Sequence, residues 1–161
     1  MAKKTFLILG IIFVIFLGII FFSFGSKDVS SLEAVSNFED DMVIYKSGSC
    51  GCCGVYSTYF KSKGNPKINV VDLQDLQAIK TKYGIPSAME SCHTTIMGNY
   101  FVEGHVPLEA VNKLLTEKPD IKGIAMPGMP SGSPGMPGAK TGDFVIYAVN
   151  NDGSYTEWMR L

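Results

Sequence analysis

All four cysteines of the chain fall into two short segments. Cys50, Cys52 and Cys53 form one cluster, and Cys92 stands beside His93 in the other. Thiolates attack disulfides and bind soft metal ions, so both segments could carry sulfur chemistry. The first cluster comes directly before a predicted helix, whose free N–H groups and dipole favour thiolate over thiol. The pattern therefore indicates either a redox site or a metal site.

The spacing of these cysteines is compatible with disulfides or with a metal ion. Cys50 and Cys53 have the C-x-x-C spacing of redox thiols, which would leave Cys52 to pair with Cys92. The adjacent residues Cys52 and Cys53 are poor starting points for two distant bridges, whereas a soft-metal site needs such crowding of thiolates. Four thiolates suit zinc or Cu(I), and added thioether ligands favour Cu(I). The cluster contains no basic residue, which argues against a phosphate-binding loop.

A segment rich in glycine, proline and methionine occupies residues 123–142. It contains 4 prolines and 6 glycines among 20 residues, together with Met126, Met129 and Met136. This composition predicts neither a helix nor a central strand, and so long a loop is either functional or disordered. Its methionines could pack over the edge of a core as flexible apolar side chains. They could also bind a soft metal, and because thioether is a poor zinc ligand, that choice would favour copper.

Around these segments the chain alternates between strands and helices. The patterns predict strands at 42–45 and 68–71, helices at 55–64, at 73–83 and from 107 onwards, and hairpins at 94–103 and 144–159. In the first helix, Val55, Tyr56, Tyr59 and Phe60 share the face expected to be buried. One right-handed crossover followed by a hairpin predicts an α/β domain, with a mixed sheet, flanking helices and a C-terminal hairpin.

The first 26 residues have the composition of a membrane segment. Between positions 6 and 24, 16 of 19 residues are apolar. As a helix this run would rise about 28 Å, close to the roughly 30 Å hydrocarbon core. Lys3 and Lys4 precede it, which predicts a cytoplasmic N-terminus and a domain in the periplasm or on the outer face of the cytoplasmic membrane. We prefer an uncleaved transmembrane anchor; cleavage near residues 23–25 and secretion to the periplasm is the alternative.

The rest of the chain divides into a linker over residues 27–41 and one domain over residues 42–161. Without Lys3 and Lys4, 12 basic and 15 acidic residues remain, a net charge of −3. A negative domain without a basic cluster argues against nucleic acid as a partner. The 2 histidines do not form a nucleophile–base–orienter set, which argues against a hydrolase.

Four motifs occur in order along residues 42–161. They are Tyr45-Lys46-Ser47 leading into Cys50-Gly51-Cys52-Cys53-Gly54, then Ser91-Cys92-His93-Thr94, Glu103-Gly104-His105-Val106-Pro107, and residues 127–136. On these motifs the domain resembles the CopG-type periplasmic copper-resistance proteins, a family often described only as a domain of unknown function. The resemblance implies a thioredoxin-like fold and copper bound by the cysteines. It also implies that Cys92-His93-Thr94 stands where thioredoxins place a cis-proline, facing the first cluster, which counts against ordinary disulfide exchange.

The residues and the resemblance together predict a ligand set. The thiolate ligands of one or more Cu(I) ions would be Cys50, Cys52, Cys53 and Cys92. Met129 and Met136 match the loop motif of the family and would act as auxiliary ligands or as a lid, whereas Met126 does not match it. His93 is a candidate ligand, with a structural role at the Cys92 turn as the alternative. His105 is interpreted as a turn or surface histidine.

The predicted function is that of a membrane-tethered copper-binding protein in copper resistance. It would act by sequestration, by transfer to copper export or chaperone proteins, or by a redox change between Cu(I) and Cu(II). Two alternatives stay open. One is a thiol–disulfide oxidoreductase that uses Cys50 and Cys53, and the other is a structural zinc-binding module.

Overall fold

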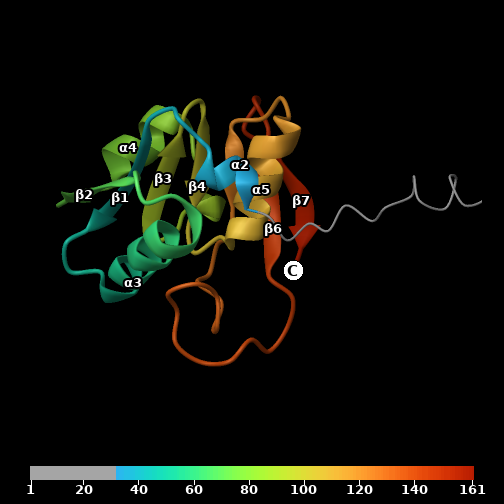
Figure 1. The fold of residues 1–161 in the computed structure, drawn as a ribbon. Coiled ribbons are helices and arrows are strands. Elements are labelled where there is room, and N and C mark those ends of the chain that lie inside the picture. The colour runs from blue at the N-terminus through green and yellow to red at the C-terminus, as the bar shows by residue number, and fades with distance from the viewer. Residues whose placement is uncertain (1–31) are drawn as a thin grey trace, which may run out of the picture. The chain divides into compact units, whose positions relative to one another are not determined.

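Seven strands form a single sheet in the order β2-β1-β3-β4-β5-β6-β7 (Figure 1). The computed structural model describes residues 32–161. The predicted membrane segment over residues 1–26 lies outside the described residues, as does the start of the predicted linker. Within residues 32–161, no helix combines the length and the apolar composition that a membrane crossing requires.

The elements follow one another in the predicted alternation. The strands span Met42–Ser47 (β1), Asn69–Leu73 (β2), His93–Met97 (β3), Tyr100–Glu103 (β4), Gly123–Ala125 (β5), Val145–Val149 (β6) and Tyr155–Arg160 (β7). The helices span Glu33–Ser36 (α2), Gly51–Tyr59 (α3), Gln77–Tyr83 (α4) and Leu108–Glu117 (α5), with a π-helical turn at Phe60–Gly64 (η1) and a 3-10 turn at Ser87–Met89 (η2).

The sheet is mixed, as the sequence predicts. β1 runs parallel to β2 and antiparallel to β3, and β4 runs parallel to β5. The pairs β3–β4 and β6–β7 are the two predicted antiparallel hairpins, the second of which is the C-terminal one. The class of mixed α/β sheet with flanking helices is therefore confirmed.

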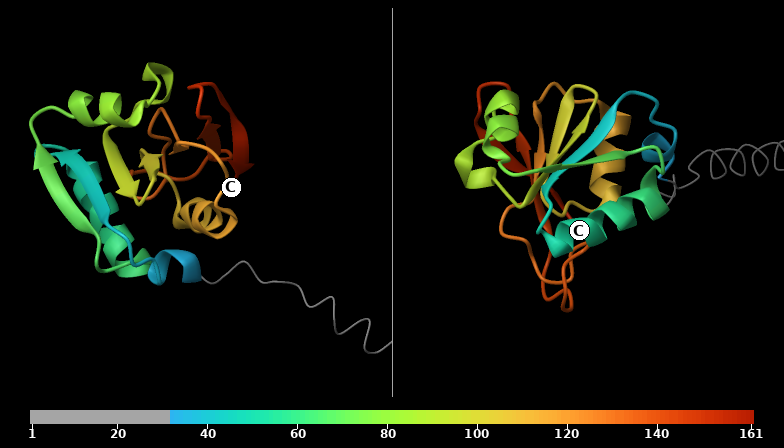
Figure 2. Two further views of the ribbon diagram at one scale, coloured as in Figure 1. Left: turned by 90° about the horizontal axis from the view of Figure 1, so that it is seen from above. Right: turned by 90° about the vertical axis from the view of Figure 1, so that its left-hand side faces the viewer.

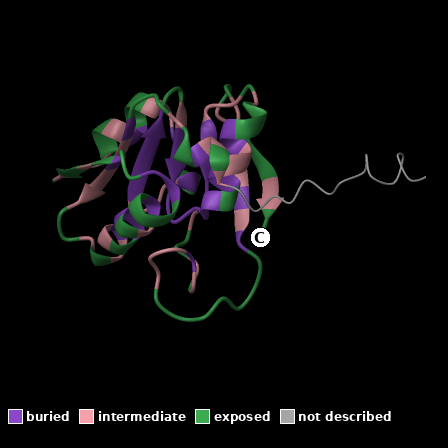
Figure 3. Ribbon diagram, in the orientation of Figure 1, coloured by how far each residue is buried: buried purple, intermediate pink, exposed green. Residues whose placement is uncertain are grey.

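Helices cover both faces of this sheet (Figure 2). α2, α3 and α5 pack on one face with the larger apolar cluster, to which β4 and β5 contribute Val102 and Ile124. α4 and η2 pack on the other face, where the same strands contribute Phe101 and Ala125. Successive residues of a strand point to opposite faces, so both faces of the central strands are buried (Figure 3).

The short helix α2 is fixed to the larger cluster by its backbone. The side-chain amide of Asn65 donates to the carbonyl oxygens of Val35, at 2.9 Å, and Phe38, at 3.1 Å. The side-chain oxygen of Asn112 accepts from the backbone N–H of Ala34 at 3.0 Å. Val35 itself is fully buried. The C-terminal part of the predicted linker is thus docked against the domain.

Two expectations from the sequence are wrong. The glycine- and proline-rich segment does contain a central strand, because Gly123–Ala125 pairs with both β4 and β6. Gly123 is suited to this place, since a Cβ atom there would overlap the carbonyl oxygen of Phe101. Val55 is 57% exposed, whereas Tyr56 and Phe60 are fully buried. Val55 is therefore exposed, although the pattern places it on the same face as the buried Tyr56 and Phe60.

Candidate metal centre

The first cysteine cluster lies where β1 turns into α3. β1 ends at Ser47, whose carbonyl oxygen accepts the N–H of Cys50 at 3.0 Å, and α3 begins one residue later. Cys50 and Cys53 are joined by a disulfide, and Cys52 is a free thiol with its sulfur 3.5 Å from that of Cys50. The turn thus gathers three sulfur atoms at the N-terminus of a helix, in a state in which two of them are oxidised.

The second cysteine approaches the cluster from the neighbouring strand. β3 is antiparallel to β1, with Lys46 opposite His93, so Cys92 lies beside the end of β1. The sulfur of Cys53 is 3.6 Å from the carbonyl oxygen of Cys92. Each of the four cysteine sulfurs lies within 4.8 Å of the others. The structure therefore brings together all the predicted thiolate ligands, and it places Cys92 against the first cluster.

His105 joins the centre from the end of β4. It is fully buried, and its Nε2 lies 3.0 Å from the sulfur of Cys92. Its Nδ1 lies 2.7 Å from the carbonyl oxygen of Pro134, which can only accept. Nδ1 therefore carries the proton, and Nε2 presents a lone pair to Cys92. The interpretation of His105 as a surface histidine is wrong.

Gly104 allows the backbone to turn so that His105 reaches this position. Its φ is +83°, and a Cβ atom there would lie 2.7 Å from the carbonyl oxygen of Met126 and 2.8 Å from the hydroxyl of Ser91. A larger residue would clash at both points, so glycine lets the chain turn tightly after β4. Ligand atoms of Cys53, Cys92, His93 and His105 also lie within 4.8 Å of one another. The centre thus offers two imidazoles beside the sulfurs.

His93 is buried beneath the cysteines. Its ring lies 4.4 Å from that of Tyr56 and 4.8 Å from that of His105, and its Nδ1 is 3.4 Å from the sulfur of Cys92. Within residues 32–161 its Nε2 has no hydrogen-bond partner. Burial, with help from His105 and Lys80, lowers the pKa of His93 to about 3. His93 is therefore neutral at physiological pH and able to act as a ligand.

The metal-free centre holds Cys92 as a thiol. Burial, followed by the neighbouring Cys52, raises the pKa of Cys92 to about 11. Burial also lowers the pKa of His105. A bound cation would reverse this preference for uncharged groups, because metals displace protons from thiols. A soft cation that bound to the Cys92 sulfur would therefore have to displace its proton.

The methionine loop rests on the centre through its backbone. Gly135 has a φ of +84°, and a Cβ atom there would lie 2.8 Å from the carbonyl oxygen of Cys52. Met136 follows it and is half-buried, while Met129 is 41% exposed. Met126 is fully packed in the larger apolar cluster, in agreement with its exclusion from the ligand set. The structure places the loop on α3; the ligand roles of Met129 and Met136 stay predictions.

Replacing Gly135 by alanine should loosen this contact. Gly128 has nearly the same φ, +83°, but nothing lies within 4 Å of the position a Cβ atom would occupy. Gly128→Ala therefore carries the backbone strain alone, and Gly135→Ala carries strain plus overlap. We expect Gly135→Ala to lower the free energy of unfolding by about 1–3 kcal/mol more than Gly128→Ala, as in other overpacked sites. Urea unfolding of both variants measures the difference, and equal losses would show that the loop does not press on α3.

The fold and this centre define an α/β domain with a sulfur-rich candidate metal site. Two solved structures resemble it, both titled copper resistance protein CopG, as form 1 with a TM-score of 0.68 and form 2 with 0.69. Each is 33% identical and covers 75% of this chain, which spans 96% and 97% of the two CopG chains. The chain therefore belongs to the CopG family of copper resistance proteins. Residues 89–136 match the family described as protein of unknown function DUF411, and no curated protein matches.

Proposed function

We propose that this protein binds Cu(I) through Cys50, Cys52, Cys53 and Cys92 on a thioredoxin-like fold, and that it serves copper resistance. The observation that carries the proposal is the convergence of four sulfur atoms within 4.8 Å of one another. The likeness to copper resistance proteins over most of the chain supports copper as the metal. The order β2-β1-β3-β4, with α3 following β1, supports the thioredoxin-like topology.

The donor set fits a soft cation. Thiolates suit Cu(I), and imidazole suits copper as well as zinc. Reduction of the Cys50–Cys53 disulfide would free two further thiols beside Cys52 and Cys92. His105 and His93 would complete the coordination or stay beside the sulfurs. Met129 and Met136 would close the site from the loop.

We place this chemistry outside the cytoplasm. The apolar run over residues 6–24 supports export, either as an uncleaved anchor or as a cleaved signal. The Cys50–Cys53 disulfide is compatible with an oxidising compartment such as the periplasm. There the protein would sequester Cu(I), pass it to export or chaperone proteins, or take part in a redox change between Cu(I) and Cu(II), with the electron passed to an external acceptor.

Copper loading tests the proposal. The full chain in mild detergent, reduced with a phosphine and loaded with Cu(I) without oxygen, should show thiolate-to-copper charge-transfer absorption. X-ray absorption should show mainly sulfur around copper. A variant in which all four cysteines are serine should lose both signals. Wild-type signals in that variant would overturn the proposal, and zinc retained in preference to copper would favour the structural zinc module.

A thiol–disulfide oxidoreductase is the second candidate. The observation in its favour is the disulfide between Cys50 and Cys53 at the N-terminus of α3, where a thiolate is stabilised. It predicts insulin reduction that survives copper chelation and disappears in Cys50→Ser. Copper binding without such turnover leaves the first proposal standing alone.

A further inference from the structure

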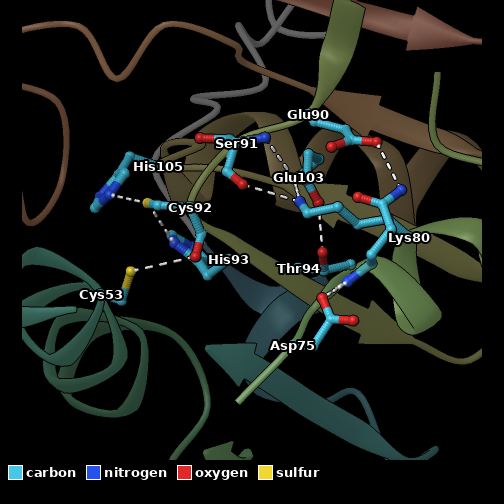
Figure 4. A network of polar contacts seen from close by, with 11 residues as sticks. Cys53, Asp75, Lys80, Glu90, Ser91, Cys92, His93, Thr94, Glu103 and His105 are labelled. Atoms are coloured by element: carbon cyan, nitrogen blue, oxygen red, sulfur yellow. Dashed lines mark hydrogen bonds and ion pairs between the residues drawn. The ribbon is translucent and has the colours of Figure 1, made fainter. Parts of the chain in front are cut away.

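An ion pair is buried behind the second cysteine segment. Lys80, on α4, contacts the carboxylate of Glu103, at the end of β4, and both side chains are almost completely buried (Figure 4). Neither is explained by the ligand set. A buried pair of this kind is weak evidence for stability, because desolvation of the two charges offsets their attraction. Its position therefore calls for another role.

Glu103 holds the cysteine segment at two points. Its Oε1 accepts the backbone N–H of Ser91 at 2.6 Å, and its Oε2 accepts the hydroxyl of Thr94 at 2.6 Å. Ser91 and Thr94 are the residues on either side of Cys92 and His93. One carboxylate thus brackets the two residues that face the first cluster.

Lys80 holds the same segment from the other side and completes what we call the bracket, the set of bonds among Lys80, Glu103, Ser91 and Thr94. Its ammonium group donates to the carbonyl oxygen of Ser91 at 2.9 Å and to Glu103. The peptide groups that lead into Cys92 are therefore fixed at both the N–H and the carbonyl of Ser91. Lys80, Ser91 and Thr94 all donate to Glu103, so both of its carboxylate oxygens take part in holding this segment.

We propose that Glu103, anchored by Lys80, is the positioning residue that orients Cys92 and His93 toward the first cysteine cluster. This inference rests on the proposed function insofar as the oriented groups bind copper. The carboxylate fixes the segment through its backbone and through Thr94, while α4 and β4 hold the carboxylate. Removing one of these bonds lets Cys92 and His93 leave the orientation in which their ligand atoms converge with those of Cys53 and His105.

The chain offers a matched pair of substitutions for the test. Thr94 and Thr95 are neighbours in β3 and both are fully buried. The hydroxyl of Thr94 donates to Glu103, whereas within residues 32–161 the hydroxyl of Thr95 has no partner. Thr94→Val removes a bond of the bracket, and Thr95→Val removes a hydroxyl of the same size that makes none. Glu103→Gln is the stronger variant, because an amide carries donors where the carboxylate only accepts.

Two measurements on the full chain in detergent test the positioning role of Glu103. In an anaerobic competition titration, Cu(I) affinity should fall about tenfold or more in Glu103→Gln and less in Thr94→Val, a range typical of groups that orient metal ligands. In the metal-free protein at one fixed pH, mass-resolved alkylation of Cys92 should be faster in Glu103→Gln and Thr94→Val than in the wild type. Alkylation of Cys52 should be unchanged. Thr95→Val should match the wild type in both. Leu114→Ala, which leaves a cavity in α5 and removes none of the bonds to Glu103, controls for lost stability and should leave both readouts unchanged in the folded protein.

The outcomes are separable. Equal behaviour of Thr94→Val and Thr95→Val in both measurements overturns the positioning role, even if Glu103→Gln fails to fold. Loss of copper affinity in Leu114→Ala equal to that in Glu103→Gln also overturns it, because stability alone would then be responsible. If the wild type itself binds no copper, the proposed function fails, and the alkylation of Cys92 still judges the bracket.

Discussion

Reduction of the Cys50–Cys53 disulfide should raise the affinity of the protein for Cu(I) by more than about a hundredfold, since even groups that only orient ligands contribute tenfold to a hundredfold. In the oxidised state the sulfurs of Cys50 and Cys53 are bonded to each other, so only Cys52 and Cys92 remain as thiols. A phosphine reduces the disulfide to two thiols and becomes a phosphine oxide, with the oxygen taken from water. Competition with a chromophoric Cu(I) chelator, run on untreated and reduced protein, measures the change.

The double variant Cys50→Ser/Cys53→Ser is the control for this prediction. It has the same free thiols as the oxidised wild type and no disulfide to reduce, so its affinity should be low and indifferent to the phosphine. Mass spectrometry after each titration shows whether Cu(I) itself has reduced the disulfide. Equal affinity of oxidised and reduced wild type would mean that Cys50 and Cys53 are not ligands, and the site would then reduce to Cys52, Cys92 and the histidines.

More of the candidate metal centre could be predicted from the sequence than cysteine spacing and hydrophobic pattern alone indicated. The strands, the hairpins and the convergence of the two cysteine segments follow from local pattern and from the resemblance. The place of His105 also follows from the predicted hairpin, because a Gly98-Asn99 turn that pairs Thr94 with Glu103 continues to Cys92 and His105. Extending that register by two residues would have placed His105 opposite Cys92. Histidine type and turn context, without register, led to the surface assignment.

Other features depend on tertiary packing and could not be predicted locally. β5 is three residues long and begins with glycine; it forms by pairing with β4 and β6, and Phe101 leaves no room for a side chain at Gly123. Lys80 sits in a helix of polar appearance, and only the fold reveals that it meets Glu103 in the interior. The choice of Cys50 and Cys53 as the oxidised pair was one of two interpretations that spacing allowed. For Gly123 and Lys80 the deciding partner is distant in the sequence, whereas Cys50 and Cys53 have a sequence separation of only 3.

Acid should destabilise the metal-free protein through His93. Its pKa is lowered from the ordinary 6.5 to about 3 by burial in the folded state. Between these values the unfolded chain binds a proton at His93 that the folded chain does not, so the free energy of unfolding falls as the pH falls from 6.5 toward 3. From about pH 7.5 to about pH 4 the loss should be about 3 kcal/mol.

His93→Phe isolates this contribution. Phenylalanine keeps an aromatic ring beside Tyr56, and it forfeits no bond at Nε2, which has no partner within residues 32–161. Urea unfolding of the oxidised, metal-free proteins measures the free energy of unfolding of the wild type minus that of His93→Phe. We expect this difference to fall by about 3 kcal/mol from about pH 7.5 to about pH 4. Carboxylates and His105 are present in both proteins and largely cancel in the difference. A difference that stays constant with pH would mean that the folded protein protonates His93 as readily as the unfolded chain does, and protons would then compete with a metal for its imidazole below about pH 6.5.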